Sequence, residues 1–522
     1  MTARHQRRSA IDRLQAPKPP KRHANGTVQG RLKFHPVRIT GRDGTSLIRA
    51  IRQGPSISVL QPSWPGETHR NRSPLASIRI DVIIPLLLFL FAAIQSLGAV
   101  DDTSFHPDES RWLNRAHFVR DLADPFGPTW EDYYTTRGQP PMGSYLMGIG
   151  LLLQGRDLDT NKIWDFAYDS RWNRFTGAMP SDEDLEAGRR TNAIVGALVV
   201  VVVYFIVSRL SNRVGGLIAG VFLSLHPLHI HLGSQALSDQ LLALLLALAF
   251  LCAFRFGRNP TWARAILLGV LLGLGGATKL SPLLLSVPLA GLGVLHLLYG
   301  YWRYRTSTSV TGPVQTAIML IAQPVIAFAA FVIVSPYLWP EPIRRTYYLF
   351  EFRRVEMVGQ SNNWPSVAVA NPAAALSRIG KRLNEDFSTT EHVQRWFGEL
   401  IGLDISVIGF DLLLAAIGGL LLILIVCKRG IWSPHAITAG LMLSELAAVV
   451  LGMGSDFYRY YLPVVLIAAI LVGVFAGETW AGARELLRSR KRRSWLRRHA
   501  TKNAVTVSEP PMQPESRRQL AS

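Results

Sequence analysis

Two adjacent carboxylates, Asp108 and Glu109, follow the first long apolar run of this chain by only a few residues, on a turn that begins with Pro107. Like charges in close quarters push their pKa values apart, so one carboxylate can serve as a general base beside an orienting or proton-sharing partner. Acidic pairs on loops are also common as solvated surface groups. The pair therefore indicates chemistry only if other polar residues converge on it.

Three further charged residues interrupt the apolar pattern: Asp239 opens one apolar run, Lys279 ends the next, and Arg459 opens the last. A charge beside a membrane span is costly and usually lines a cavity or pairs with another charge. Lys279 and Arg459 supply positive charge that suits a phosphate or diphosphate leaving group at the membrane surface. A base beside such a clamp predicts group transfer from a lipid phosphate. The structural alternative is that Asp239 pairs with Lys279 or Arg459, or that the basic side chains extend to lipid headgroups.

The composition predicts a polytopic membrane protein. Of 522 residues 48% are apolar, the mean hydropathy is positive, and apolar runs near the roughly 20 residues needed to cross a bilayer recur along most of the chain. The formal net charge of +20 resides mainly in the two tails, which favours a role in membrane orientation over nucleic-acid binding. Cys252 and Cys427 each lie in an apolar run, so no disulfide framework is expected.

We predict an all-α transmembrane bundle of about ten spans with a large first external loop that carries juxtamembrane helices. The expected spans are residues 80–100, 190–210, 214–231, 236–255, 262–279, 281–299, 314–338, 405–427, 435–453 and 459–479.

Charge asymmetry predicts the sidedness of the chain. Residues 1–80 carry 16 Lys or Arg against 3 Asp or Glu, and residues 481–522 carry 11 against 3, so both tails should be cytoplasmic in the cell membrane. Two external regions result, 101–189 and 339–404, and the first holds 16 carboxylates against 8 basic residues up to position 188. The expected organisation is a flexible basic tail over 1–79, a transmembrane domain over 80–480 and a second flexible basic tail over 481–522.

The apolar segment 140–153 is too short to span a bilayer. If it were a span, every later connection would change sides, and the Arg-bearing connections would then lie outside the cell. We therefore predict that it lies along the outer surface of the membrane.

Five motifs occur in the order Asp108-Glu109, residues 138–145 (GQPPMGSY), 236–239 (ALSD), 273–282 (GLGGATKLSP) and 458–463 (YRYYLP). Together they resemble the GT-C membrane glycosyltransferases, the group that contains the protein O-mannosyltransferases and the lipid A aminoarabinose transferases. The resemblance covers roughly residues 80–480.

The resemblance implies an enzyme that moves a monosaccharide, a hexose or a pentose, from a polyprenyl-phosphate donor to a protein, glycan or lipid acceptor outside the membrane, with inversion. Asp108 would deprotonate the acceptor hydroxyl, with Glu109 as its neighbour in the pocket. Lys279 and Arg459 would hold the carrier phosphate, and Asp239 would help to shape the site.

One motif departs from the family pattern. Where relatives often have His or Lys just before the two prolines, this chain has Gln139, and Arg137 two positions earlier is the expected substitute for the missing cation. His106 is a further site-shaping candidate. No cofactor is expected; a divalent metal on His106 and Asp108 is the less favoured alternative, as is one on His226, His229 and His231.

Two other functions remain open. A transporter or flippase of lipid-linked saccharides would spread charged residues through the membrane midplane and show an internal repeat, whereas these charges gather at one face. A non-catalytic relative in an envelope-assembly complex would tolerate loss of Asp108. The aromatic residues of the second external region suit either sugar stacking or an interfacial belt.

Overall fold

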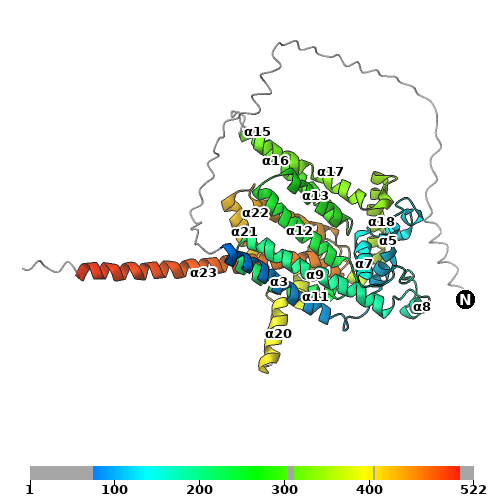
Figure 1. The fold of residues 1–522 in the computed structure, drawn as a ribbon, viewed down its shortest axis with the longest axis horizontal. Coiled ribbons are helices and arrows are strands. Elements are labelled where there is room, and N and C mark those ends of the chain that lie inside the picture. The colour runs from blue at the N-terminus through cyan, green and yellow to red at the C-terminus, as the bar shows by residue number, and fades with distance from the viewer. Residues whose placement is uncertain (1–73, 304–310, 404–405, 506–522) are drawn as a thin grey trace, which may run out of the picture. The chain divides into compact units, whose positions relative to one another are not determined.

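The structure is a computed structural model that describes residues 74–303, 311–403 and 406–505 (Figure 1). Within these ranges the regular structure is helical, and the one β-type pairing is an isolated antiparallel bridge between Ala368 and Ser455. The all-α prediction is thereby confirmed for this part of the chain. The predictions for tail residues 1–73 and 506–522 lie outside the described residues.

The body of the bundle consists of the helices that carry the apolar runs. They are α3 (Pro74–Gly98), α9 (Asp182–Leu210), α10 (Arg213–Ser224), α11 (Pro227–Gly233), α12 (Asp239–Arg258), α13 (Trp262–Gly276), α14 (Ser281–Leu284), α15 (Ser286–Arg303), α16 (Thr311–Ile321), α17 (Gln323–Ile333), α21 (Asp411–Arg429), α22 (Pro434–Gly452) and α23 (Leu462–Val505).

Further helices, most of them short, lie in the connections between these spans. The first connection holds α4 (Pro107–Asn114), η2 (Arg115–His117), α5 (Phe118–Asp121), η3 (Pro128–Trp130), α6 (Tyr134–Arg137), α7 (Met142–Leu153) and α8 (Ser170–Phe175). The later ones hold η4 (Pro336–Leu338), α18 (Pro342–Asn363), η5 (Pro365–Val367), α19 (Pro372–Lys381), the π-helix η6 (Arg382–Asp386), α20 (Thr389–Ile401) and η7 (Tyr458–Tyr461).

The ten predicted spans all fall on helices, but they are not ten equal crossings. The described residues contain eight helices that are long and apolar enough to cross a membrane, and nine if α10 and α11, which bend by 62° at His226, form one broken span. The tenth, α13, has 15 residues and is about 22 Å long, less than the roughly 30 Å of a hydrocarbon core. The prediction for residues 262–279 was therefore too long, because it continued the span through the turn after Gly276.

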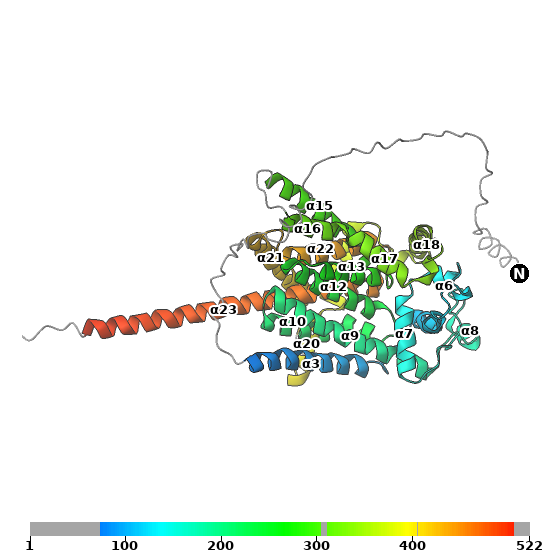
Figure 2. The ribbon, with the colours of Figure 1, turned by 45° about the horizontal axis from the view of Figure 1, so that its top comes forward.

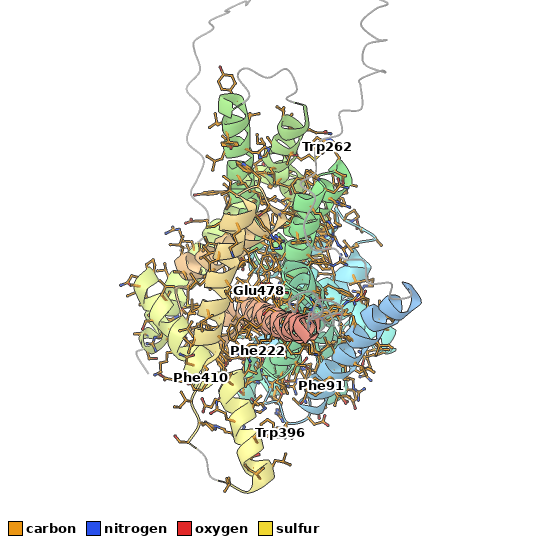
Figure 3. All side chains as sticks on the ribbon, turned by 90° about the vertical axis from the view of Figure 1, so that its left-hand side faces the viewer. Phe91, Phe222, Trp262, Trp396, Phe410 and Glu478 are labelled. Carbon is orange, nitrogen blue, oxygen red and sulfur yellow. The ribbon has the colours of Figure 1, made fainter. Side chains whose placement is uncertain are left out.

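Burial distinguishes central from peripheral spans. The apolar part of α23 is 78% buried, and Figure 3 shows this helix end-on at the centre of the bundle, whereas the corresponding window of α21 is only 22% buried. The uncovered faces of the peripheral helices consist of apolar side chains such as Leu87, Ile94 and Leu420, which are 57–68% exposed. A belt of this kind is stable only against lipid, since water would not accept so large an apolar surface.

The charge pattern predicts that the Arg-bearing connections all lie on one side of the membrane. The helix ends beside these connections do lie close together. At one end of the bundle His435 contacts the carbonyl oxygen of Leu210, Trp432 packs on His296, and Arg213 pairs with Asp81. At the other end, α4, α5, α7, α8 and α18 gather away from the free end of α23 (Figure 1). We call this second end the site end.

The predicted surface position of α7 agrees with its packing. Figure 2 shows α7 running across the end of the bundle while α9 and α10 run along it. The helix is fixed there by a bond from the Met142 amide to the carbonyl oxygen of Ala277 (3.0 Å) and by one from the Tyr145 hydroxyl to that of Val334 (3.0 Å).

The C-terminal tail differs from the prediction. Residues 481–522 were expected to be flexible, but α23 continues as a helix through Val505. The segment after the span contains Leu486, Leu487 and several Arg residues and only one glycine, at position 482, and such side chains favour a helix once a buried span has nucleated it.

The sidedness can be tested by cysteine labelling. After replacement of the exposed Cys427, single cysteines at Asp165 and Asn362 should react with an impermeant maleimide added to intact cells, because both lie in predicted external regions. Cysteines at Gly30 and Val505 should react only after permeabilisation. Labelling at position 30 in intact cells would contradict the predicted orientation.

Candidate functional site

The first turn of α4 presents the two carboxylates. His106 is the N-cap and Pro107 occupies the first helical position, where its missing N–H costs nothing. The amide of Asp108 donates to Nδ1 of His106 (3.1 Å), and the amide of His106 donates to Oε2 of Glu109 (2.8 Å), which closes a capping box. Burial lowers the pKa of His106, which keeps its ring neutral and able to accept this bond. Since consecutive helical residues point about 100° apart, Asp108 and Glu109 face different partners.

Glu109 is fully buried and both of its oxygens are occupied. Arg189 on α9 donates to Oε1 from Nε (2.8 Å) and to Oε2 from Nη2 (3.0 Å), and the amide of Ala236 donates to Oε1 (2.8 Å). Arg189 also donates to the carbonyl oxygens of Val100 (2.9 Å) and Thr103 (2.8 Å). The Glu109–Arg189 pair thus holds α4 against α9, the link after α3 and the segment before α12.

Asp108 points to a different side of α4 from Glu109 and pairs with Arg459 in η7. The Asp108 residue is only 5% exposed. Burial raises the pKa of this carboxyl, but the nearby guanidinium groups of Arg459 and Arg111 outweigh it and lower the pKa to about 2. The carboxylate is therefore ionised at neutral pH in the free protein.

A second ion pair lies beside the first. Lys279 pairs with Asp239 at the start of α12. Tyr460 connects the two pairs, because its ring centroid lies 5.8 Å from Nζ of Lys279 and 5.7 Å from the guanidinium of Arg459. Arg353 on α18 donates to the Tyr460 hydroxyl (2.9 Å). The structure thus brings together the four charged residues that the sequence selected and adds a third cation, Arg353.

The loop before Arg459 is fastened by the connection between α17 and α21, residues 339–403. Asp456 accepts bonds from Arg382 at Nε (3.2 Å) and Nη2 (2.9 Å) and from the Tyr461 hydroxyl (2.5 Å). Its amide donates to the carbonyl oxygen of Val367 (2.6 Å). Residues 339–403 therefore position Arg459, a role that their aromatic and Arg content did not indicate.

Arg137 and Gln139 lie apart from these ion pairs. Nε of Arg137 lies 2.9 Å from Oδ1 of Asp132, which also accepts from the Tyr337 hydroxyl (2.9 Å). The guanidinium next to Gln139 is instead that of Arg115, which donates to Gln139 Oε1 (2.9 Å). The expected substitution of Arg137 for the missing cation stays a prediction.

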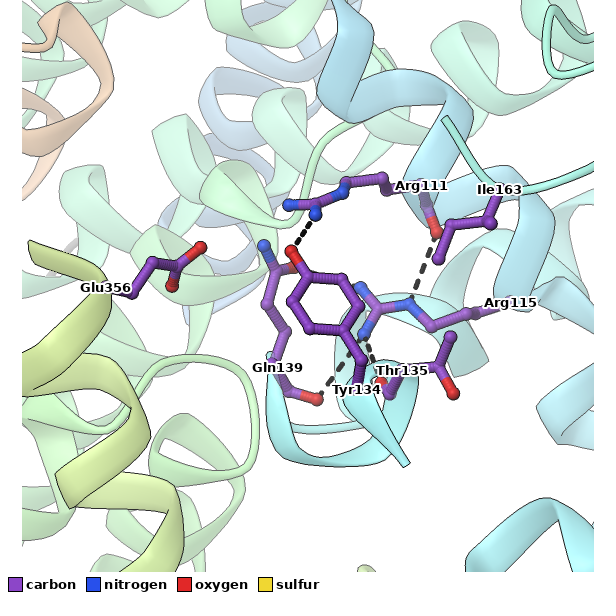
Figure 4. A pocket seen from close by; sticks show the side chains of 8 residues that line it. Arg111, Arg115, Tyr134, Thr135, Gln139, Ile163 and Glu356 are labelled. Atoms are coloured by element: carbon purple, nitrogen blue, oxygen red, sulfur yellow. Dashed lines mark hydrogen bonds between the residues drawn. The ribbon is translucent and has the colours of Figure 1, made fainter. Parts of the chain in front are cut away.

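A pocket opens beside α4 (Figure 4). It is small and open to solvent, and Arg111, Arg115, Tyr134, Gln139, Ile163 and Glu356 are among the residues that line it. Sequence reasoning missed Arg111, although its place one helical turn after Asp108 on α4 was a usable signal.

Histidines of the site end serve as helix caps. His106 caps α4, and His226 caps α11 by accepting from the Leu228 amide (3.2 Å). In the part of the chain that the structure describes, no three His, Cys, Asp or Glu side chains come close enough to hold a metal ion.

The chain is therefore a polytopic helical protein whose carboxylate–cation pairs are buried at the site end, beyond the ends of the spans. Residues 113–337 match the family model of the dolichyl-phosphate-mannose-protein mannosyltransferases. This match confirms the resemblance to the GT-C membrane glycosyltransferases that the motifs predicted. It includes Asp239 and Lys279, whereas Asp108 and Arg459 lie outside the matched residues.

The solved structures found by comparison have low sequence identity to this chain, and their TM-scores are below 0.5. The S. cerevisiae protein O-mannosyltransferase Pmt1-Pmt2 complex bound to the sugar donor has 17% identity and a TM-score of 0.36, over 50% of this chain and 35% of that one. ArnT from Cupriavidus metallidurans bound to undecaprenyl phosphate has 15% identity and a TM-score of 0.39, over 77% and 60%.

The oligosaccharyltransferase AglB from Archaeoglobus fulgidus, in complex with an inhibitory peptide and a dolichol-phosphate, has 14% identity and a TM-score of 0.39, over 76% of this chain and 50% of that one. This chain thus aligns with between about a third and three fifths of these three proteins. No curated protein matches the chain.

Loss of the Glu109 charge should destabilise the fold. Glu109→Gln leaves the buried Arg189 guanidinium unpaired, so the free energy of unfolding should fall by about 3–5 kcal/mol. Denaturant titration of tryptophan fluorescence in detergent would measure this loss. Asp102→Asn, at an exposed carboxylate, is the matched control and should unfold like the wild type. Equal unfolding of both variants would contradict the structural role of Glu109.

Proposed function

We propose that this protein is a glycosyltransferase that moves a monosaccharide from a polyprenyl-phosphate donor to an acceptor hydroxyl on the outer side of the membrane. The observation that carries the proposal is the placement of Asp108, buried and paired with Arg459, beside the Lys279–Asp239 pair in a chain that matches the mannosyltransferase family. The polyprenyl-phosphate donor is supported by the dolichyl phosphate in the description of that family.

The proposed reaction is an inverting displacement. The acceptor oxygen bonds to the anomeric carbon while the bond from that carbon to the phosphate oxygen breaks, and the electron pair leaves on the polyprenyl phosphate. Asp108 takes the hydroxyl proton. Lys279 and Arg459 neutralise the charge that develops on the leaving phosphate, and Tyr460, which lies against both cations, keeps them close together.

The ion pair between Asp108 and Arg459 makes the basicity of Asp108 depend on whether the donor is bound. With Arg459 on its carboxylate, Asp108 has a pKa of about 2 and is a weak base. A donor phosphate would compete for the Arg459 guanidinium, and any loss of that contact raises the pKa of Asp108 toward its ordinary value. Asp108 would thus become a better base when a sugar donor is present, which limits unproductive proton transfer in the empty enzyme.

Glu109 and Asp239 would act as positioning residues. Glu109 has both oxygens engaged by Arg189, Ala236 and His106, so it orients α4 and leaves proton transfer to Asp108. Asp239 holds Lys279 at the site until a phosphate competes for it.

One buried group fits the transporter alternative. Glu445 lies fully buried within the span α22, and neither of its oxygens has a hydrogen-bond partner among the described residues. An intramembrane carboxylate is typical of transport pathways. The carboxylates Asp108, Glu109 and Asp239 instead gather at the site end, which favours transfer chemistry over transport.

Asp108→Asn tests the proposed base. The substitution keeps the size of the side chain but removes its charge, so kcat should fall by about 10²–10⁴-fold while donor binding is largely retained. Transfer from synthetic polyprenyl-phosphate sugars by purified protein in nanodiscs is the measurement. Asp159→Asn, at an exposed carboxylate that pairs with Arg120, is the charge-matched control and should keep wild-type turnover. Full turnover of a folded Asp108→Asn protein would exclude Asp108 as the base.

Neutralising the proposed phosphate clamp should weaken donor binding. Lys279→Gln or Arg459→Gln should raise the donor KM roughly 10- to 150-fold, since a hydrogen bond to a charged group contributes about 1.5–3 kcal/mol. The double variant Lys279→Gln/Asp239→Asn removes both members of one pair and leaves no unpaired carboxylate behind. If the double variant binds donor like the wild type, the effect of Lys279→Gln alone came from Asp239, and the clamp assignment of Lys279 is wrong.

A further inference from the structure

Two arginines in the pocket beside α4 have no carboxylate partner. Within the described residues, no Asp or Glu oxygen lies within 4 Å of the guanidinium nitrogens of Arg111 or Arg115, in contrast to Arg137, Arg353 and Arg459. Nε of Arg111 is buried and has no hydrogen-bond partner, while another of its nitrogens donates to the Tyr134 hydroxyl. Arg111 is partly buried, and a guanidinium that is even partly removed from water without a paired carboxylate is costly, so this pocket carries positive charge that an anion would neutralise.

Arg115 adds charge without being available as a ligand itself. It is 4% exposed, stacks on Trp112 and donates to Gln139 Oε1 and to the carbonyl oxygen of Thr135 (3.1 Å). Burial and the neighbouring Arg111 lower its pKa to about 9, so it remains charged at neutral pH. Arg111 is the residue that can bind, and Arg115 strengthens the field around it.

The acidic residue of the pocket does not cancel this charge. Glu356 lines the pocket from α18 but is paired with Arg353 (2.5 Å). Figure 4 shows the Arg111 and Arg115 guanidinium groups on either side of the Tyr134 ring, with the Glu356 carboxylate further away. The pocket as a whole therefore has an excess of positive charge.

We propose that Arg111 binds the anionic group, a carboxylate or a phosphate ester, of an acidic sugar acceptor while Asp108 deprotonates a hydroxyl of the same acceptor. This inference rests on the proposed glycosyl transfer. Arg111 follows Asp108 by three residues on one helix, which places their Cβ atoms about 5–6 Å apart. A sugar acid spans a similar distance between its acidic group and a ring hydroxyl.

The position of the pocket favours the acceptor over the donor. All of its lining residues come from the two connecting regions at the site end, and none comes from a membrane span. A polyprenyl chain lies in the bilayer, so its phosphate should meet the cations at the span ends, Lys279 and Arg459. The rings of Tyr134 and Phe166, which pack against the Arg111 guanidinium at 5.1 and 4.5 Å, offer apolar faces for a sugar ring.

Binding measured without turnover tests the inference. Full-length protein in phosphatidylcholine nanodiscs would be titrated with trigalacturonate, with glucose 6-phosphate and with neutral maltotriose by saturation-transfer NMR. We expect binding of trigalacturonate or of the sugar phosphate in preference to maltotriose, and Arg111→Gln should weaken it roughly tenfold or more. Whichever anion binds more tightly identifies the acidic group. Arg344→Gln, at an exposed arginine of α18 outside the pocket, is the matched control and should bind like the wild type.

Three outcomes would overturn the proposal. Equal binding of maltotriose, or no effect of Arg111→Gln, would show that the pocket does not select anions. Displacement of trigalacturonate by undecaprenyl phosphate added to the nanodiscs would assign Arg111 to the donor. Tighter binding of a tetraglutamate peptide would replace the sugar with a protein acceptor.

The failure of this inference and that of the proposed function are distinguishable. The titration requires neither donor nor catalysis, so it succeeds or fails whether or not the protein transfers sugar. Conversely, loss of transfer in Asp108→Asn together with no binding of any anion would retain the glycosyltransferase and remove only the acidic acceptor.

Discussion

The buried Glu109–Arg189 pair is the contact on which the geometry of the site end depends. Two charges removed from water are stable only if nearly all of their hydrogen-bonding capacity is satisfied, and here it is satisfied by groups from α4, from α9, from the link after α3 and from the segment before α12. Because so many segments meet at one carboxylate, the first turn of α4 has a single orientation. That orientation directs Asp108 away from Glu109 and toward Arg459.

Three other carboxylates of the site end are each paired with a cation. Asp108, Asp239 and Asp456 each pair with a cation from a distant segment, so these carboxylates are neutralised in the resting protein. Arg111 and Arg115 of the pocket differ, since neither has a carboxylate partner among the described residues. The site thus has two kinds of cation. An anionic substrate can bind Lys279 or Arg459 only by displacing the paired carboxylate, whereas it can bind Arg111 without displacing one. This difference is the physical basis for separating a donor phosphate from an acidic acceptor.

The connection between α17 and α21 completes a site whose ion-paired carboxylates Asp108, Glu109 and Asp239 come from the first half of the chain. Arg353 on α18 reaches Tyr460, and Arg382 after α19 holds Asp456, so two separate contacts stabilise the loop that presents Arg459. The isolated bridge between Ala368 and Ser455 adds a backbone contact to the same loop. Small changes in this region would therefore alter the position of Arg459 without touching a substrate.

Hydropathy and charge, which are local properties, determined much of this protein. Apolar runs predicted the helices and their order, and the charge balance predicted which helix ends would meet, because a bilayer imposes the same length and sidedness on each span. Their positions beside apolar runs were enough to select Asp108, Asp239, Lys279 and Arg459, since charges beside a span need partners. Only the tertiary structure decided which partners they have: Glu109 pairs with Arg189 and Arg137 with Asp132, while Arg111 in the pocket has no carboxylate partner among the described residues. These contacts cannot be deduced from distance along the sequence. Glu109 and Arg189 are 80 residues apart and Asp108 and Arg459 are 351 apart, and such pairs form only when packing of the helices brings them together.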